Sequence, residues 1–351
     1  MSGAIVDEVL ASPGGDLAVA AASPWQLARR RLLRNRVALV MAALLAVIVA
    51  LCLCAPLYAH HVAHVDPFQS NLDGTTIVNG KRVPVMVQST QGLGLGVTPI
   101  GPTWDIHHYF LGADEQGRDV AARLLYGGRN SLLIGTAAAL ITCFLAVLIG
   151  VVAGFFGGLV DGVLSRFLDL IWAFPVYLLA ISLSTVLIAR GISFGPFHLT
   201  SGSLLLPIVI IGVVYIPYVA RPVRGEVLSI RRREFVEAAI GLGASNWRLL
   251  WNEVLPNVIT TVIVLFPLML AIDMLTEAAL SFLSIGVQAP QASWGTIILD
   301  GQDVLYTRPA VALAPGIAIA LTVLALNVLG DGIRDALDPR AKLRRTDAEK
   351  Q

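Results

Sequence analysis

Residues 131–156 read SLLIGTAAALITCFLAVLIGVVAGFF, an apolar run without one charged side chain. An α-helix needs about 20 apolar residues to cross the hydrocarbon core of a bilayer, so this run is long enough to span a membrane. By the same criterion further segments qualify, at 37–59, 167–189, 204–220, 257–285 and 309–330. The sequence therefore predicts an all-α integral membrane protein with about six transmembrane helices.

The composition of the whole chain supports this fold class. Of its 351 residues 56% are hydrophobic and 14% are charged, and the mean hydropathy is +0.75. Soluble domains carry about a quarter charged residues, so lipid must be the solvent for much of this chain. The formal net charge is only +1, which gives no indication of a nucleic-acid partner. Cys52, Cys54 and Cys143 lie inside apolar runs, and we expect no disulfide framework, no metal and no cofactor.

The first apolar run follows a group of arginines, a combination that also begins a signal peptide. These arginines are Arg29, Arg30, Arg31, Arg34 and Arg36. The run at 37–59 is longer than the roughly 7–15 apolar residues of a signal peptide and fits a full span. We therefore expect an uncleaved first transmembrane helix.

The placement of Lys and Arg predicts the orientation of the chain. With six spans, the N-terminal tail, the loop between the fourth and fifth spans and the C-terminal tail lie on one side, and all three are rich in cations. The positive-inside rule makes that side cytoplasmic, which predicts a multi-pass protein of the inner or plasma membrane. The predicted organisation is a cytoplasmic tail at 1–36, a first helix at 37–59, an extracytoplasmic segment at 60–117, a five-helix core at 118–330 with a cytoplasmic loop at 223–256, and a cytoplasmic tail at 331–351.

The long extracytoplasmic segment carries structural signals of its own. Residues 76–83 read TIVNGKRV, in which Asn79 and Gly80 form a two-residue turn that requires positive φ at both positions. A stretch that we expect to be a loop follows, with Gly92, Gly94, Gly96, Pro99, Gly101 and Pro102. The sequence thus predicts a small β-hairpin insert outside the membrane.

The sequence shows few signals of enzyme motifs or of metal-binding patterns. There is no phosphate loop of the form G-x-x-x-x-G-K-[ST], because Gly80 and Lys81 are followed by Arg82, and H-E-x-x-H is absent. We therefore expect no ATP hydrolysis and no other enzyme activity. Histidines gather in the extracytoplasmic segment, where they could hold a divalent metal or simply be solvated at the membrane interface: His60, His61, His64, His107 and His108.

Two groups of residues inside the predicted spans need an explanation. Gly150, Gly154 and Gly158 form two overlapping G-x-x-x-G steps, which predict close helix packing. Asp273 and Glu277 lie four apart on one face of the span at 257–285. Because charge is costly in hydrocarbon, these acids either line a pathway or gate, or pair with a neighbouring Ser, Thr or backbone group, or lie near the outer interface.

The loop between the fourth and fifth spans holds the most informative stretch. Residues 231–257 read RRREFVEAAIGLGASNWRLLWNEVLPN. The Glu237-Ala238-Ala239 sequence favours a helix, and Gly243 permits a turn. A second helix follows, with an apolar face formed by Trp247, Leu250 and Trp251. A short helix held between two spans is suited to docking into a groove of a partner protein.

This stretch resembles the EAA loop of the permease subunits of ATP-binding-cassette (ABC) importers. The matching residues are Glu237, Ala238, Ala239, Gly243, Leu255 and Pro256, whereas Glu253 stands where relatives commonly have His. Further stretches are similar to the dipeptide and oligopeptide permease C-subunit group (DppC/OppC-like), at 111–119, 123–129, 169–175, 280–288, 293–295 and 327–340. The similarity covers most of residues 25–340, but 68–101 matches no family motif and is interpreted as an insertion.

The resemblance implies a fold of the ABC-importer permease type and a set of partners. Such a subunit forms a translocation pathway for short peptides with a homologous permease, in contact with membrane lipid, two cytoplasmic ATP-binding subunits and an extracytoplasmic solute-binding protein. The EAA loop would transmit the closure of the ATPases to the spans, which alternate between two states. The same family contains importers of nickel and other small solutes. A stand-alone secondary transporter or a membrane enzyme is the alternative of another class, for which the loop has no use.

Overall fold

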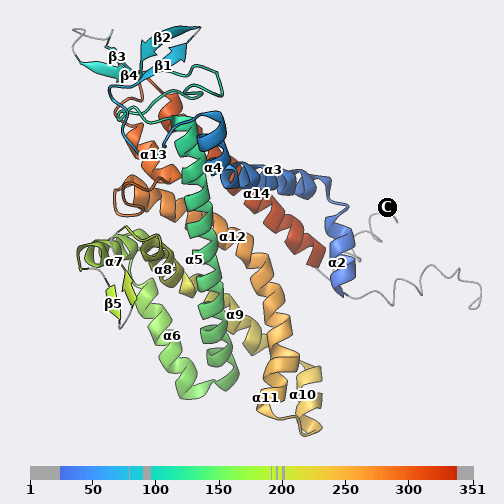
Figure 1. Cartoon of the computed structure of the whole chain (residues 1–351). Coiled ribbons are helices and arrows are strands. Elements are labelled where there is room, and N and C mark those ends of the chain that lie inside the picture. The colour runs from blue at the N-terminus through green and yellow to red at the C-terminus, as the bar shows by residue number, and fades with distance from the viewer. Residues whose placement is uncertain are drawn as a thin grey trace, which may run out of the picture.

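The computed structural model describes residues 24–337, with gaps at 79, 90–95, 191, 195–196 and 200–201, and it is mostly helical (Figure 1). Its helices are α2 (Pro24–Leu32), α3 (Arg36–Leu53), α4 (Ala55–Leu57), α5 (Val120–Phe156), α6 (Gly158–Trp172), α7 (Val176–Arg190), α8 (Leu205–Val214), α9 (Ile216–Ile230), α10 (Glu234–Gly241), α11 (Asn246–Leu249), α12 (Leu255–Phe282), α13 (Trp294–Asp300) and α14 (Ala310–Leu337). Two π-helical turns, η1 (Tyr58–Val62) and η2 (Leu250–Val254), follow α4 and precede α12.

The helices confirm the all-α membrane fold. Within the described residues, four are long and apolar enough to cross a membrane: α3, α5, α12 with the turns before it, and α14. Two helix pairs pass the same test as bent units, α6 with α7 at 85° and α8 with α9 at 42°. The chain therefore has four to six membrane-spanning elements, in agreement with the prediction of about six.

The predicted spans at 167–189 and 204–220 are each broken in the structure, so their prediction as continuous helices is wrong. The first break lies between Trp172 and Val176, because Pro175 has no N–H to donate and disfavours helical backbone at Phe174. The second break lies at Tyr215, and Pro217 stands in the first turn of α9, where its missing N–H costs nothing.

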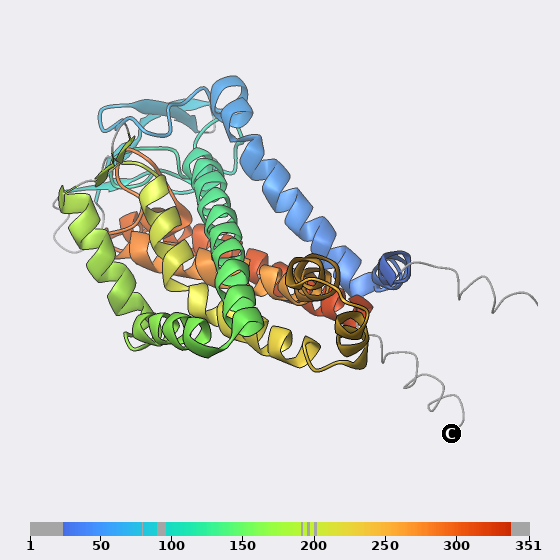
Figure 2. The ribbon, with the colours of Figure 1, turned by 90° about the horizontal axis from the view of Figure 1, so that it is seen from below.

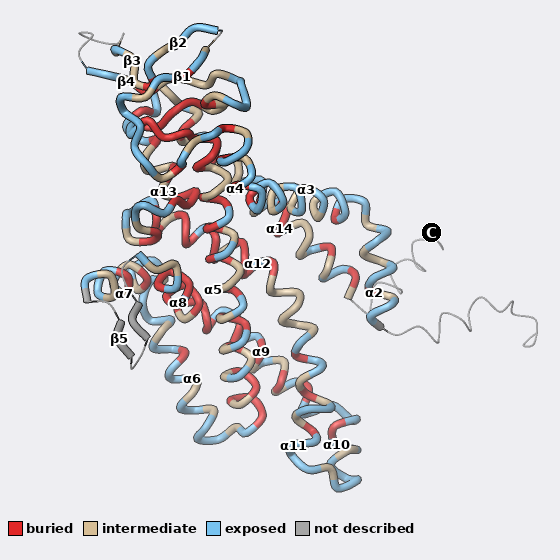
Figure 3. The backbone as a smooth tube through the Cα atoms, viewed as in Figure 1, coloured by how far each residue is buried: buried red, intermediate tan, exposed pale blue. Residues whose placement is uncertain are grey.

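Helix α5 is the central element of the fold. It runs the length of the molecule in Figure 1, and Figure 2 shows it between α3 on one side and the α6–α7 pair on the other. Its buried residues pack against α8, α9, α12 and α14. Figure 3 shows the buried positions concentrated along α5, α8 and α9, whereas α3 is largely exposed. An exposed apolar helix of this kind is what a lipid-facing span requires.

Small residues bring α5 close to α9. A Cβ atom at Gly150 would lie 2.7 Å from the carbonyl oxygen of Ala220, and one at Gly154 would lie 2.8 Å from Cβ of Val227. Glycine at these positions therefore permits a backbone approach that any side chain would prevent. Gly158 takes no part in this contact, since it follows the end of α5 with φ +55°, and no described atom lies within 4 Å of the position of its Cβ.

The predicted hairpin is present outside the helical part. Strands β1 (Thr75–Val78) and β2 (Lys81–Pro84) are antiparallel, Val78 is opposite Lys81, and Gly80 has φ +76°. The stretch expected to be only a loop also contains a strand, because β4 (Val97–Pro99) pairs with β3 (Met86–Gln88) in a second hairpin. A third antiparallel pair, β5 (Ile192–Phe194) with β6 (Phe197–Leu199), lies between α7 and α8.

The first two hairpins rest on a small apolar core of their own. Val85, Tyr109 and Ala113 are buried together, with Ile100 packed against them. Backbone hydrogen bonds fix this layer, from the N–H of Ile100 to the carbonyl of Val85 at 2.8 Å and from the N–H of Ala113 to the carbonyl of Ile100 at 3.0 Å. The insert is therefore an ordered cap at one end of the helical bundle (Figure 1).

The α5–α9 contact gives a prediction about stability. Gly150→Ala places a methyl group against backbone and should lower the free energy of unfolding by about 1–3 kcal/mol, as overpacking does. Gly316→Ala in α14 is the matched control, because no described atom lies within 4 Å of its Cβ position and alanine favours helix by about 1 kcal/mol. Thermal midpoints of the purified proteins in detergent should fall for the first and not for the second. Equal midpoints would show that α5 and α9 are not closely packed.

Candidate functional site

The loop at 231–257 forms the helix, turn and second helix that the sequence predicts. Helix α10 ends at Gly241, and Gly243 has φ +81°, a left-handed conformation that glycine adopts without strain. The side chain of Ser245 then accepts a hydrogen bond from the N–H of Arg248 and caps α11. In Figure 1, α10 and α11 lie at the opposite end of the molecule from β1–β4.

One face of this loop holds it to the bundle, and the other is apolar and exposed. Val236, Leu249 and Val254 are buried in the main core. The outer face carries large apolar side chains that face solvent, the most exposed being Leu242 at 90%; the others are Phe235, Ile240, Trp247 and Trp251. The rings of Trp247 and Trp251 contact each other edge to face, with centroids 5.6 Å apart. A contiguous apolar surface of this kind is typical of a protein-binding site.

The predicted loop residues lie around this surface. Glu237, Ala238, Gly243 and Pro256 are exposed, and Ala239 and Leu255 are half-buried. Leu255 begins α12, directly after the η2 turn, so the loop continues into a spanning helix without a flexible link. Displacement of the loop would therefore move α12.

The two intramembrane acids are both buried inside the chain. Asp273 and Glu277 have no exposed surface. Ser281 donates a hydrogen bond to Glu277 Oε1 at 2.7 Å, and Ser131 and Ser293 are the other hydroxyl groups beside this carboxyl. Among the described residues no hydrogen bond reaches Glu277 Oε2 or either oxygen of Asp273.

For Glu277 this arrangement matches one of the alternatives that the sequence left open, the structural pair with a neighbouring Ser. Glu277 is held by the hydroxyl of Ser281, one turn further along the same helix, as a structural partner would be. Asp273 lacks such a partner in the described part of the chain, although the neighbouring hydroxyls of Tyr215 and Thr276 bond each other at 2.7 Å. An orphaned carboxyl in a spanning helix is costly, so this conformation leaves Asp273 in need of a proton, water or another state.

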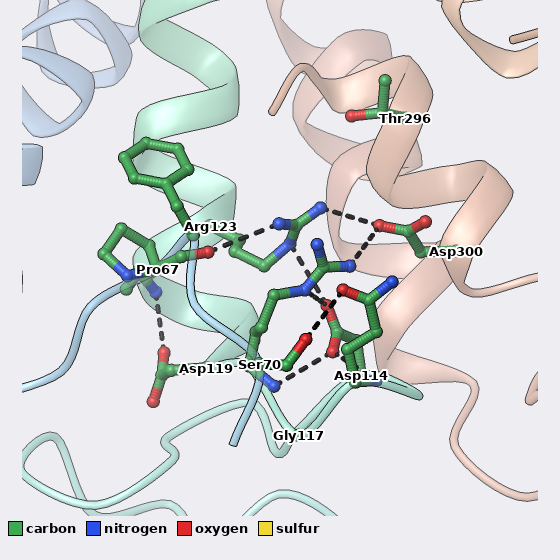
Figure 4. Close-up of polar contacts among 12 residues, drawn as sticks. Pro67, Ser70, Asp114, Gly117, Asp119, Arg123, Thr296 and Asp300 are labelled. Atoms are coloured by element: carbon green, nitrogen blue, oxygen red, sulfur yellow. Dashed lines mark hydrogen bonds and ion pairs between the residues drawn. The ribbon is translucent and has the colours of Figure 1, made fainter. Parts of the chain in front are cut away.

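A cluster of ionic side chains lies at the N-terminal end of α5 (Figure 4). Arg118 and Arg123 are buried at 7% and 2% exposure. Arg118 Nε donates to Asp114 Oδ2 at 2.7 Å, and Asp300 Oδ2 accepts from both arginines, at 2.9 Å from Arg118 and 2.7 Å from Arg123. Two cations and two anions compensate one another here, which is the condition for burying charge.

This ionic cluster joins distant parts of the chain. Asp114 and Arg118 belong to the segment before α5, Arg123 to the first turn of α5, and Asp300 to the end of α13. Arg123 also donates to the carbonyl of Pro67 at 3.3 Å. Sequence reasoning singled out the stretches that contain Asp114, Arg118 and Arg123, but it missed Asp300, which no motif or spacing marks.

Asp119 determines where α5 begins. Its Oδ1 accepts a hydrogen bond from the N–H of Ala122 at 2.7 Å, which makes it the N-cap. Its Oδ2 has no hydrogen-bond partner among the described residues, and burial raises the pKa of this carboxyl to about 6. The predicted span at 131–156 is therefore the inner part of a helix that starts at Val120.

His107 and His108 have different hydrogen-bond partners. His107 Nδ1 lies 3.1 Å from the carbonyl oxygen of Val62, and His108 Nδ1 lies 2.9 Å from Asp105 Oδ2. The backbone N–H of His107 and the ring of His108 hold the pKa of Asp105 below its usual range. In the part of the chain that the structure describes, no group of three or more His, Cys, Asp or Glu side chains is arranged to hold a metal ion.

Matches to known protein families show the class of protein to which this chain belongs. The family described as "Binding-protein-dependent transport system inner membrane component" matches residues 146–343, and the family described as "N-terminal TM domain of oligopeptide transport permease C" matches residues 23–74. The chain is therefore a transport component of the membrane, and it belongs to the binding-protein-dependent transport system inner membrane component family.

The chain is also similar to individual transport proteins. The dipeptide transport system permease protein DppC of Alkalihalophilus pseudofirmus is 32% identical over 332 residues, which cover 94% of this chain and 95% of the relative. The glutathione transport system permease protein GsiD of Pectobacterium atrosepticum is 35% identical over 235 residues, 67% of this chain and 73% of the relative. Among solved structures, an inward-facing conformation of the MetNI methionine ABC transporter has a TM-score of 0.50 at 18% identity, covering 61% of this chain and 96% of that one, which shows a shared fold.

The raised pKa of Asp119 predicts a pH-dependent stability. Because the folded chain holds this proton more tightly than the unfolded chain, where an Asp pKa is about 4, the contribution of Asp119 is full below about pH 4 and is lost as pH rises to about 6. Asp119→Asn keeps a side chain that can cap α5 and removes the titration.

The measurement is the thermal midpoint of wild type and variant in detergent between pH 4 and pH 8. The advantage of Asp119→Asn over wild type should grow as pH rises to about 6 and then stay constant. Asp119→Ala is the companion variant, because it loses the titration and the cap, and it should be about 1 kcal/mol less stable than Asp119→Asn at every pH. A constant difference between wild type and Asp119→Asn across this range would contradict the assignment.

Proposed function

We propose that this chain forms half of the translocation pathway of an ABC importer for short peptides. A homologous permease supplies the other half, two cytoplasmic subunits bind and hydrolyse ATP, and an extracytoplasmic binding protein delivers the peptide. The family supports the transport role, and the relatives named for dipeptide and glutathione transport support the peptide class of substrate.

The observation that carries the proposal is the exposed apolar face of α10 and α11. Leu242, Trp247 and Trp251 would be unfavourable in water unless another protein covered them. The acidic first turn of α10, with Glu234 and Glu237, adds polar groups at the rim of this surface. A groove on an ATP-binding subunit that accepts a short amphipathic helix would bury these side chains.

The connection of this loop to α12 supports its role in coupling. Because η2 leads directly into α12, ATPase closure would displace a helix that carries Asp273 and Glu277. The proposed coupling residues are Glu237, Ala238, Ala239, Gly243, Leu255 and Pro256. Asp273 and Glu277 would respond to the same movement as groups of the pathway or its gate.

The orientation follows the charge distribution of the sequence. We place the N-terminal tail, the α10–α11 loop and the C-terminal tail in the cytoplasm, and the hairpin insert outside the membrane. The proposed domains are the tail at 1–36, the first span at 37–59, the outer segment at 60–117, the permease core at 118–330 and the tail at 331–351. ATP hydrolysis is assigned to the partner subunits, since the sequence has no phosphate loop.

The importer interpretation is favoured over the alternatives by specific observations. A stand-alone carrier would have no partner for the apolar face of α10 and α11. A nickel-selective pathway would require metal ligands, and the described residues contain no group of three or more His, Cys, Asp or Glu that could hold a metal.

The test is a substitution on the exposed loop surface. Leu242→Asp should leave the fold intact, because Leu242 is 90% exposed, and should weaken ATPase binding at least ~30-fold, the effect of losing about 2 kcal/mol at an interface hot spot. Leu159→Asp, at the start of α6, is the matched control, because this leucine is 89% exposed on another surface. Both are co-expressed with the partner permease, the ATPases and the binding protein.

Two measurements decide the outcome. Co-purification of the ATPases should be lost only with Leu242→Asp, and ATP-dependent uptake of a labelled tripeptide by proteoliposomes should be lost with it. Retention of the ATPases and of uptake in Leu242→Asp would exclude this surface as the coupling site. ATP turnover without peptide uptake in the wild-type complex would refute the peptide-importer function.

A further inference from the structure

Helices α6 and α9 present a polar and aromatic surface to the outside of the chain, although both belong to candidate membrane spans. We call it the α6–α9 face; two further residues complete it, from the break after α6 and from α7, and its members are Asp169, Trp172, Phe174, Tyr177, Tyr218 and Arg221. Each of these side chains is between 41% and 51% exposed. The chemical groups on this face determine whether lipid, water or protein can lie against it.

An ion pair lies at its centre. Arg221 donates from a guanidinium N–H to Asp169 Oδ1 at 2.8 Å, and its guanidinium carbon lies 4.6 Å from the centre of the Trp172 ring. The Trp172 and Tyr218 rings are 4.6 Å apart. Hydrocarbon around a half-exposed ion pair would withhold hydration from both charges, which costs several kcal/mol.

The position of the pair follows from the packing of α9 against α5. Ala220 and Val223, on either side of Arg221 in α9, pack against Gly150 of α5. Gly150 precedes Phe156, the last residue of α5, by a distance of about 9 Å along the helix axis. The pair is therefore level with the apolar part of α5.

The backbone at this face is also unsuited to contact with lipid. The break between α6 and α7 is exposed from Trp172 to Pro175. Non-helical backbone at membrane depth occurs only where protein buries it or where it lines a water-filled cavity. The exposed charges and the exposed break thus both disfavour lipid at this face and leave water or a partner protein to cover it.

The face also connects to the interior. The rings of Tyr218 and Tyr215 are 5.5 Å apart, and the hydroxyl of Tyr215 bonds Thr276 Oγ1 at 2.7 Å. Thr276 lies between Asp273 and Glu277 on α12. A series of contacts therefore runs from the exposed ion pair to Thr276 on α12, the helix that carries Asp273.

We propose that the α6–α9 face lines the water-filled pathway and forms the surface along which a zwitterionic short peptide passes. This inference rests on the proposed function and assigns the residues that the peptide meets. Asp169 and Arg221 can exchange their mutual contact for the ammonium and carboxylate of the peptide, and the aromatic rings offer apolar contact to its side chains. Because the two charges pair with each other, the peptide is held weakly and leaves, as conduction requires.

The first experiment measures water access. A complex without native cysteines carries either Phe174→Cys on the face or Phe144→Cys on α5, and Phe144 is a matched control because it is 64% exposed among apolar neighbours. The probe is a methanethiosulfonate with a trimethylammonium group, added to proteoliposomes that hold the assembled complex, with and without ATP. Phe174→Cys should react at least ~10-fold faster than Phe144→Cys in one nucleotide state, because the reactive thiolate forms in water and not in lipid.

The second experiment asks whether the peptide uses this surface. The bulky adduct on Phe174→Cys should reduce ATP-dependent tripeptide uptake at least ~10-fold while ATPase turnover continues, since it occupies the path without touching the coupling loop. A reducing agent that removes the adduct should restore uptake. The same treatment of Phe144→Cys should change neither quantity.

The outcomes separate this inference from the proposed function. Equal reactivity of the two cysteines in every nucleotide state would overturn the inference, because the face would then be covered by lipid or protein. Full uptake through a labelled Phe174→Cys complex would overturn it as well, because water would reach the face without the peptide. If the untreated wild-type complex hydrolyses ATP and takes up no peptide, the proposed function fails, and the labelling still reports whether water reaches the face.

Discussion

Hydrocarbon offers no partner to a polar group, and this constraint governs the whole chain. Every backbone amide at membrane depth must bond within the protein, so the spanning elements are helices and their irregularities lie where protein or water can satisfy them. The same constraint determines where charged side chains can lie. Arg118 and Arg123 are buried at the N-terminal end of α5 only together with Asp114 and Asp300, and Asp119 accepts a hydrogen bond from a free amide of the first helical turn.

The fold was largely predictable because apolar length is a strong signal, whereas the breaks were not. Pro175 and Pro217 are visible in the sequence, yet proline is tolerated in many membrane helices, so its presence does not say which helix bends. The second hairpin was missed for a related reason. Its strand Val97–Pro99 is short and follows a glycine-rich stretch, and the residues that flank the pair, Val85 and Ile100, pack with Tyr109 and Ala113 in a cluster that no local pattern encodes.

The candidate sites differ in how far the sequence defines them. The loop around Gly243 was found because a positive-φ glycine between two short helices is a local feature. The partners of Asp273, and the role of Asp300 in joining α13 to α5, are long-range properties that appear only when the helices are assembled. The α6–α9 face belongs to the same group, since Asp169 and Arg221 are 52 positions apart and neither is unusual by itself.

The two ion pairs between α6 and α9 also bear on how the protein is made. Asp161 pairs with Arg224 across 63 positions, and Asp169 with Arg221 across 52, so each carboxylate leaves the ribosome well before its arginine. Until α9 arrives, α6 holds two carboxylates without these partners, and a bilayer rejects such a segment. Arg166 of the same helix lies only 3.8 Å from Asp169, but Asp161 has no such cation in α6. We therefore expect the α6–α7 unit to enter the bilayer together with α9, as one cooperative step.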